Sequence, residues 1–203
     1  MTAARKLIRE ATLADLEALP RTWRGEIIDG TLYAFPRPRA PHARVEGGVH
    51  SDIFGPFDRG RGGPGGWWIL PEPGIELPRA KELSPDVAGW RRERLPRLPT
   101  KGAITAVPDW VCEVLSRSTR GYDLVTKHNF YAQIGVGHLW YIEPLARALT
   151  VSRLEGGRWL EIGTYGEHEK VSAEPFDAVE IHIDAWFEGI EPDDEDDEDD
   201  EDD

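Results

Sequence analysis

Apolar residues recur at helical spacing over residues 41–57 of this chain. Val45, Val49, Ile53 and Phe57 fall about one turn apart, which predicts a helix with one buried face. A shorter helix is expected over residues 12–17, where Thr12 stands in a capping position.

A second long helix is predicted over residues 120–134. Its apolar residues share one face, and Gly135 is a typical stop because glycine favours the left-handed turn after a helix. Lys127 lies in the centre of that apolar face. An ordinary i,i+4 ion pair with Asp123 is one explanation. Delivery of an ammonium group to a buried site is the other.

Strands are predicted from short apolar or alternating runs between turn residues. Asp29-Gly30 is a strong hairpin signal between the runs 26–28 and 31–35. One strand-helix-strand crossover among many hairpins predicts an α+β protein with an α/β-like core, in which helices flank a mixed β-sheet. An N-terminal hairpin and C-terminal β-strands complete it. The further expected strands span 67–70, 74–77, 86–89, 110–115, 138–142, 148–154, 158–162 and 179–183.

Glu113 interrupts the apolar run of the strand expected over residues 110–115. Burial of an unpaired carboxylate costs several kcal/mol, so such a group pairs with a cation, binds a metal or stays protonated. Asp86 follows Pro85 at the start of another expected strand. Its ordinary explanation is a turn aspartate that bonds to nearby backbone. Either residue alone is compatible with a structural role.

Asp86, Glu113 and Lys127 together indicate phosphodiester chemistry. Two carboxylates from neighbouring strands suit Mg²⁺ or Mn²⁺, which are held by carboxylates, waters and substrate phosphate. Such an ion lowers the pKa of bound water and neutralises charge that develops on phosphorus. A nearby ammonium can orient or deprotonate the attacking water, or stabilise the crowded transition state.

The chain resembles the PD-(D/E)XK nuclease superfamily, and within it the Uma-two family of restriction endonucleases. The resemblance implies one restriction-endonuclease-like domain over residues 1–190 that hydrolyses DNA. It also implies Mg²⁺ or Mn²⁺ held by Asp86 and Glu113, with the Val114 carbonyl as a third protein ligand. The segments that carry it are 24–30, 41–42, 84–86 and 108–119, followed by Asp123, Lys127, Tyr131 and 135–142.

Leu115 stands where the superfamily pattern usually has its lysine, two residues after Glu113. Lys127 is then expected to serve as a lysine that has migrated to the helix. Glu26 resembles an N-terminal acidic position of the family. It is expected either to contact the metal or a catalytic water, or to be a solvated hairpin residue. His42, in the first turn of its helix, is expected to contact substrate phosphate or to cap.

The composition suits a single globular domain. With 203 residues, of which 39% are hydrophobic, the chain can bury a substantial core without disulfides. Cys112 is the single cysteine, which excludes an intramolecular disulfide and a cysteine-rich zinc site. No apolar run approaches the roughly 18 residues of a membrane span, and no signal peptide begins the sequence. We therefore expect a cytoplasmic protein with no membrane partner.

Negative charge is concentrated at the C-terminus. The net charge is -14, and residues 191–203 hold 12 acidic residues and no basic one, so this tail is expected to be disordered. The rest of the chain is nearly neutral. Its arginines at 37–39, 59–61 and 91–94 are either solvated loop charges or contacts for DNA phosphates. The tail is expected to meet this basic surface, a basic partner or neither, and a homodimer is left open.

Three functions are compatible with these patterns. The leading one is a divalent-metal-dependent endonuclease that hydrolyses DNA phosphodiester bonds. The alternative is a non-catalytic DNA-binding or protein-interaction module that keeps the nuclease fold, and Leu115 is the residue that supports it. The third is a structural Glu113-Lys127 salt bridge in an unrelated α+β protein. An ion between Asp86 and Glu113 would separate the first from the third.

Overall fold

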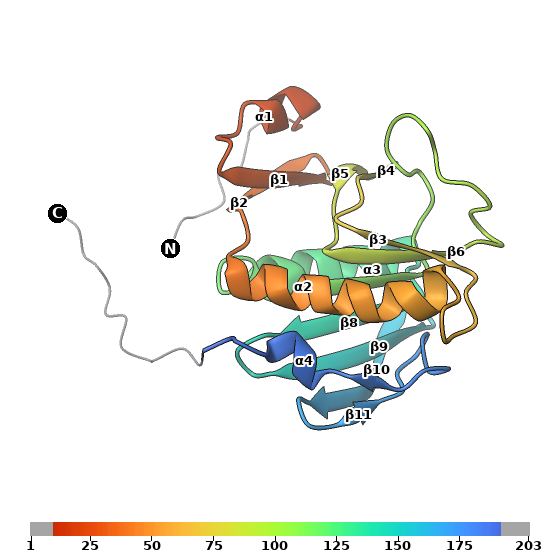
Figure 1. Ribbon diagram of the computed structural model, residues 1–203. Coiled ribbons are helices and arrows are strands. Elements are labelled where there is room, and N and C mark those ends of the chain that lie inside the picture. The colour runs from red at the N-terminus through yellow and green to blue at the C-terminus, as the bar shows by residue number, and fades with distance from the viewer. Residues whose placement is uncertain (1–9, 192–203) are drawn as a thin grey trace.

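A six-stranded mixed sheet forms the centre of the fold in the computed structural model, which describes residues 10–191 (Figure 1). Strands β7 and β8 pair in parallel, and the other neighbours are antiparallel. The predicted α+β class and the single crossover are therefore confirmed. The strand order is β10-β9-β8-β7-β6-β3, with β3 (Trp67–Pro71), β6 (Val87–Arg91), β7 (Trp110–Val114), β8 (His138–Glu143), β9 (Ala148–Glu155) and β10 (Arg158–Gly166).

A four-stranded sheet lies beside this central sheet, in the order β2-β1-β5-β4. The predicted hairpin is confirmed, because Asp29 and Gly30 form its turn with φ values of 49° and 71°. One strand, β5, was not predicted. Only the first and last of its four residues are buried, so its sequence has no strand pattern. The strand forms because it pairs with β1 and β4. The elements are α1 (Leu13–Glu17), β1 (Trp23–Ile28), β2 (Thr31–Pro36), β4 (Ile75–Leu77) and β5 (Ala80–Leu83).

Helix α2 (Ala40–Ile53) covers one face of the central sheet (Figure 1). Val45, Val49 and Ile53 are completely buried against that sheet, as the helical spacing predicted. The helix continues into a π-helical turn, η1 (Phe54–Asp58), so the predicted boundary near Phe57 is correct although the last turn is wider. Burial of these three side chains fixes the rotation of α2 about its own axis.

The helical segment over residues 120–134 lies against the other face of the sheet. It ends at Gly135 with φ 83°, as predicted. Its first part is different from the expectation, because η2 (Tyr122–Lys127) is π-helical and only α3 (His128–Ile134) is a regular α-helix. The wider turn buries Tyr122, Asp123 and Lys127 together. Single π-helical turns of this kind are frequent at functional sites.

The last strand predicted near the C-terminus is shorter than expected, whereas β10 is longer and β11 (Lys170–Val171) was not predicted. The strand predicted over residues 179–183 is confined to β12 (Ile181–His182), which pairs with β11. A short helix, α4 (Asp184–Phe187), follows because Trp186 and Phe187 are buried against α2 and its core. The acidic tail predicted from residue 191 lies outside the described residues, except for Glu191. Within residues 10–191, no helix is long and apolar enough to cross a membrane.

Candidate active site

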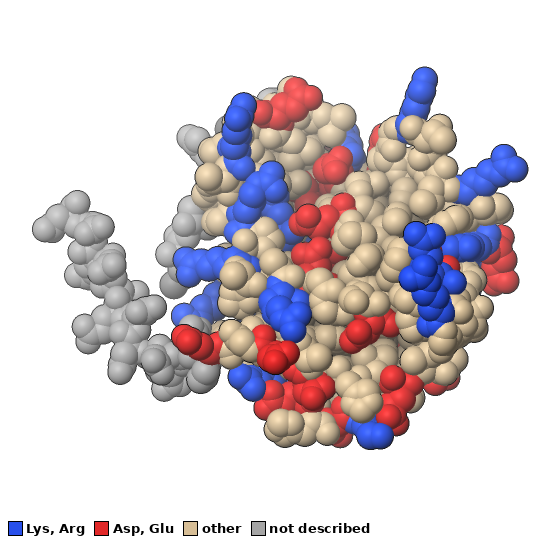
Figure 2. Space-filling model, viewed as in Figure 1, with Lys and Arg blue, Asp and Glu red and all other residues tan. Residues whose placement is uncertain are grey.

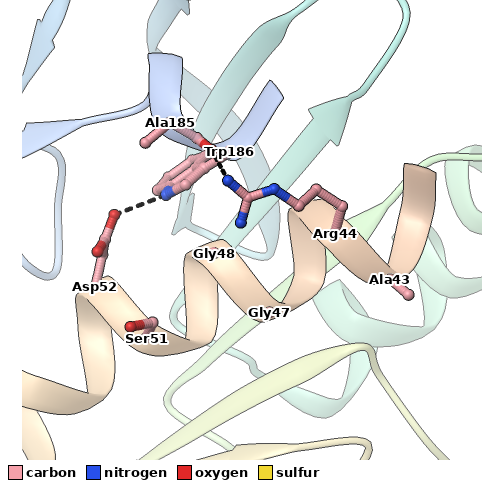
Figure 3. Close-up of a pocket in the computed structure, with 8 residues that line it drawn as sticks. All are labelled: Ala43, Arg44, Gly47, Gly48, Ser51, Asp52, Ala185 and Trp186. Atoms are coloured by element: carbon pink, nitrogen blue, oxygen red, sulfur yellow. Dashed lines mark hydrogen bonds between the residues drawn. The ribbon is translucent and has the colours of Figure 1, made fainter. Parts of the chain in front are cut away.

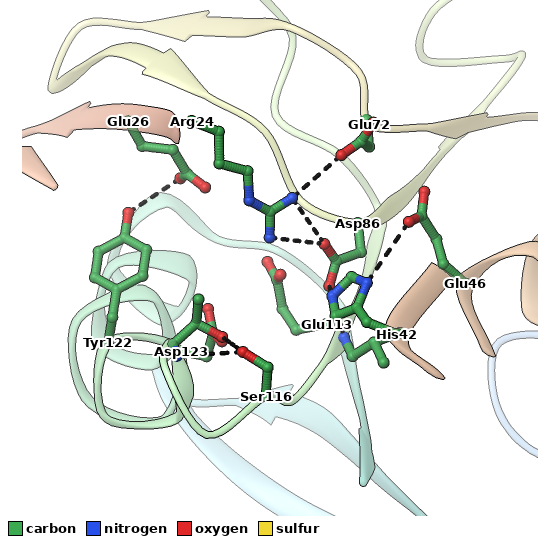
Figure 4. Close-up of polar contacts among 12 residues, drawn as sticks. Arg24, Glu26, His42, Glu46, Glu72, Asp86, Glu113, Ser116, Tyr122 and Asp123 are labelled. Atoms are coloured by element: carbon green, nitrogen blue, oxygen red, sulfur yellow. Dashed lines mark hydrogen bonds and ion pairs between the residues drawn. The ribbon is translucent and has the colours of Figure 1, made fainter. Parts of the chain in front are cut away.

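Buried acidic side chains gather where the two sheets and two helical segments meet (Figure 4). The pairing of strands β6 and β7 brings two of these side chains together. Val87 is opposite Cys112 in this antiparallel pair, so Asp86, one residue before Val87, lies opposite Glu113, one residue after Cys112. The sequence-predicted neighbours are therefore neighbours in the sheet. The acidic members of this cluster, each at most 5% exposed, are Glu26, Asp86, Glu113 and Asp123.

Lys127 is 1% exposed and supplies the ammonium of the cluster. Its Nζ lies 2.8 Å from Glu113 Oε1, 3.2 Å from Glu26 Oε1 and 3.8 Å from Asp123 Oδ1. The i,i+4 pair with Asp123 is thus present but is the longest of the three contacts. Burial opposes the charge of Lys127, yet these carboxylates outweigh it and raise the lysine pKa above its ordinary value. Lys127 is held as an ammonium ion.

Asp86 is bound from three directions. Its Oδ2 accepts a hydrogen bond from the Val114 N–H at 2.7 Å and lies 3.1 Å from His42 Nε2. Its Oδ1 lies 3.3 Å from an Arg24 guanidinium nitrogen. Burial works against ionisation, but the His42 hydrogen bond and the charges of Lys127 and Arg24 hold the pKa of Asp86 below its ordinary value. His42 therefore contacts Asp86 and does not cap the helix.

Two tyrosines complete the hydrogen bonding of the glutamates. The Tyr131 hydroxyl donates to Glu113 Oε1, and the Tyr122 hydroxyl donates to Glu26 Oε2 at 3.0 Å. The pKa of Glu113 is raised well above its ordinary value, because burial and the neighbouring carboxylates outweigh Lys127. Burial also raises the pKa of Asp123 to about 6, again against the pull of Lys127. The cluster also contains more acidic groups than cations, since four carboxyl groups surround Lys127 and Arg24.

The donor set fits a divalent cation. Four buried carboxylates share one buried ammonium and the Arg24 guanidinium, and carboxylate oxygens are the ligands that Mg²⁺ and Mn²⁺ prefer. A bound dication would offset the excess negative charge that raises the pKa of Glu113. Ligation by Asp86, Glu113 and the Val114 carbonyl remains a prediction. Val114 lies beside Asp86, to which it donates its N–H.

Leu115 lies where the superfamily lysine is usual, and its side chain is 5% exposed within the apolar cluster that also contains Val111. This position therefore holds a core residue that packs against apolar neighbours. Lys127 reaches Glu113 from the helical segment instead. That Lys127 takes over the role of the superfamily lysine stays a prediction of the resemblance.

Sequence reasoning missed Arg24 and Glu46. One nitrogen of His42 and one oxygen each of Glu46 and Asp86 lie within 4.8 Å of one another. Burial, the Asp86 charge and the Glu72 charge raise the pKa of Glu46 to about 7. The signal for Glu46 was its i,i+4 spacing from His42 on a predicted helix. For Arg24 no comparable local signal exists, because its contact with Asp86 is made between two different sheets.

The surface charge around the cluster is uneven. Figure 2 shows acidic side chains in the middle of one face, with basic side chains on either side of them. Several arginines that sequence analysis offered as phosphate contacts already have local partners. Arg91 lies 4.5 Å from the centroid of the Trp67 ring, Arg92 lies 3.9 Å from that of Trp68, and Arg94 pairs with Asp109. These side chains are held by the fold.

A separate hollow of about 330 Å³ lies between α2 and α4 (Figure 3). Asp52 in its wall accepts a hydrogen bond from Trp186 Nε1 at 2.8 Å, and Arg44 donates to the Ala185 carbonyl at 2.7 Å. Its lining shares no residue with the acidic cluster, and its polar groups are engaged in joining the two helices. We therefore assign the chemistry to the acidic cluster and not to this hollow.

The fold is similar to that of a solved structure described as "Crystal structure of a putative nuclease belonging to DUF820 from Anabaena variabilis ATCC 29413". The sequence identity is 20%, the TM-score is 0.66, and the alignment covers 87% of this chain and 97% of that chain. The protein is thus an α+β protein with a nuclease-like fold. Over residues 12–184 it matches the Uma2 family, "Putative restriction endonuclease", and the chain belongs to that family. Among curated proteins, none matches.

Proposed function

We propose that the protein is a divalent-metal-dependent endonuclease that hydrolyses DNA phosphodiester bonds. The observation that carries this proposal is the contact of 2.8 Å between Lys127 Nζ and Glu113 Oε1, with Asp86 on the adjacent strand. It supplies two carboxylates and a buried ammonium within one site, and the family membership supports nuclease chemistry. We place the activity in the cytoplasm, where a restriction-type enzyme meets DNA.

Asp86 and Glu113 would hold Mg²⁺ or Mn²⁺, with the Val114 carbonyl as a further ligand. The ion would neutralise charge on the phosphate and lower the pKa of bound water. Arg24 and His42 position the Asp86 carboxylate through their hydrogen bonds.

Lys127 stabilises negative charge that develops on phosphorus or orients the attacking water. It does not act as the base, because its pKa is raised and the amine stays protonated. Tyr131 and Tyr122 hold Glu113 and Glu26 through their hydroxyl groups. Glu26 contacts Lys127 and so positions the ammonium.

Cleavage of supercoiled plasmid tests the proposal directly. We expect the parent to nick or linearise plasmid when Mg²⁺ or Mn²⁺ is present, and EDTA to stop the reaction. Glu113→Gln should abolish cleavage, while Glu143→Gln, which removes a surface partner of Arg120, should retain it. A parent that binds DNA but never cleaves it under any of these conditions would favour the non-catalytic binding module.

A further inference from the structure

The imidazole of His42 has one nitrogen without a hydrogen-bond partner. The side chain is 5% exposed, and its Nδ1 is buried with no hydrogen bond. Buried polar atoms in folded proteins are nearly always satisfied, so an orphaned ring nitrogen calls for a specific explanation. The nearest charged group on its own helix is Glu46, whose Oε2 lies 3.8 Å from Nδ1.

The other ring nitrogen is already oriented. His42 Nε2 lies 3.1 Å from Asp86 Oδ2, and Figure 4 shows the ring between the carboxylates of Asp86 and Glu46. Histidines that ligate metals generally donate their second ring N–H to a carboxylate, which fixes the tautomer and the ring orientation. In the neutral tautomer that donates its Nε2 proton to Asp86, Nδ1 presents a lone pair towards Glu46.

Helix α2 makes the pair possible. His42 and Glu46 are one turn apart, so both side chains leave the same side of the helix. His42 belongs to the same buried stripe as Val45 and Val49, and their packing in the core prevents rotation of the helix. Glu46 retains 15% exposure of its side chain, so the carboxylate side of the pair reaches solvent.

We propose that His42 Nδ1 and Glu46 bind a first-row transition-metal ion that accepts imidazole ligands, such as Co²⁺, with Asp86 orienting the imidazole. An imidazole nitrogen selects such ions over Mg²⁺, which prefers oxygen ligands. This position shares Asp86 with the one between Asp86 and Glu113, but its two proposed ligands, His42 and Glu46, are different residues. It contains no contact with Lys127, and ion binding there does not require that the protein cleave DNA.

Titration of tag-free protein with Co²⁺ tests the proposal, followed by visible absorption and calorimetry. We expect ligand-field bands in the parent that Mg²⁺ does not displace at comparable concentration. His42→Gln and Glu46→Gln should each weaken Co²⁺ binding at least about tenfold, because loss of even an orienting partner weakens metal sites 10- to 100-fold. His50→Gln is the matched control, since His50 lies two turns further along α2 and also has an unpartnered ring nitrogen.

Three outcomes overturn the proposal: no Co²⁺ bands in the parent, unchanged affinity in both His42→Gln and Glu46→Gln, or equal loss in His50→Gln. Circular dichroism and metal-free melting of each variant separate loss of a ligand from loss of the fold. Glu113→Gln should keep the Co²⁺ bands while it loses plasmid cleavage. A parent that binds Co²⁺ in this way but never cleaves DNA would overturn the nuclease proposal and leave the metal site standing.

Discussion

Lys127 lies 2.8 Å from Glu113 although the two side chains come from different elements, the π-helical segment η2 and strand β7. Leu115 occupies the strand position on the same face as Glu113 and is packed in the apolar core. The ammonium therefore approaches the carboxylate from the helix. Placement of the charge depends on the wide turn of η2, which buries Asp123 and Lys127 together.

Replacement of Lys127 by methionine should separate chemistry from packing, because methionine keeps an unbranched stem without the charge. We expect Lys127→Met to lower the rate of plasmid cleavage by about 10²- to 10³-fold, the effect of losing one preorganised donor to a developing anion. Mg²⁺ binding should persist. Lys170→Met, at an exposed ion pair with Glu180, is the control. Cleavage by Lys127→Met at the parental rate would make Lys127 structural.

A second-site change tests the migrated-lysine interpretation. Leu115→Lys places an ammonium on the Glu113 face of the strand, in the usual superfamily position. In the Lys127→Met background it should recover part of the lost cleavage rate. Recovery by Leu115→Met would instead point to packing, and that variant is the control. Absence of any recovery in a well-folded double variant would argue that the two positions are not equivalent.

Mg²⁺ should stabilise the protein against heat. Binding to the folded state alone contributes about 2.7 kcal/mol at a hundred times the Kd, which corresponds to a rise of about 5–10 °C in Tm for a chain of this size. Glu113→Gln should remove the rise, because it removes a ligand from the site. Differential scanning calorimetry with and without Mg²⁺ measures it. An undiminished shift in Glu113→Gln would place the Mg²⁺ ion elsewhere.

Asp123 should make the metal-free protein less stable as pH rises. Its pKa is about 6 in the folded protein against an ordinary 3.8, so the folded state holds the proton more tightly. The stability present below about pH 4 is then lost as pH rises through about 6, by up to about 3 kcal/mol. Asp123→Asn cannot ionise, so its free energy of unfolding should fall less over this interval. If urea unfolding gives the parent and Asp123→Asn the same dependence of unfolding free energy on pH, Asp123 is not the group responsible.

Two adjacent glycines of α2 should respond in opposite directions to alanine. A Cβ at Gly48 would lie 2.7 Å from Trp186 Cδ1, whereas a Cβ at Gly47 would meet nothing within 4 Å. Gly48→Ala should destabilise the protein by about 1–3 kcal/mol through overpacking. Gly47→Ala should stabilise it by up to about 1 kcal/mol through helix propensity. Thermal unfolding of both variants tests this contrast. Equal changes in Tm would mean that Trp186 of α4 does not pack against Gly48 of α2.

The sequence alone was sufficient to predict which face of each major element is buried. Val45, Val49 and Ile53 are in the core because their spacing follows the helical period, and Asp29-Gly30 forms a hairpin because glycine and aspartate tolerate positive φ. The same local logic showed that Lys127 lies on an apolar helix face and that Glu113 interrupts an apolar strand. Such predictions succeed because they depend on periods within one element.

Only the tertiary structure decided which of these side chains meet. The contacts of Lys127 with Glu26, and of His42 with Asp86, join elements that are distant in sequence, and no local period encodes such distances. The π-helical turn was missed because one extra residue per turn leaves no distinct pattern in so short a segment. Glu46 is a charged residue at the edge of the buried stripe of α2, and its spacing alone does not show what it contacts. It becomes part of a site because packing of α2 on the central sheet brings it to the Asp86 carboxylate.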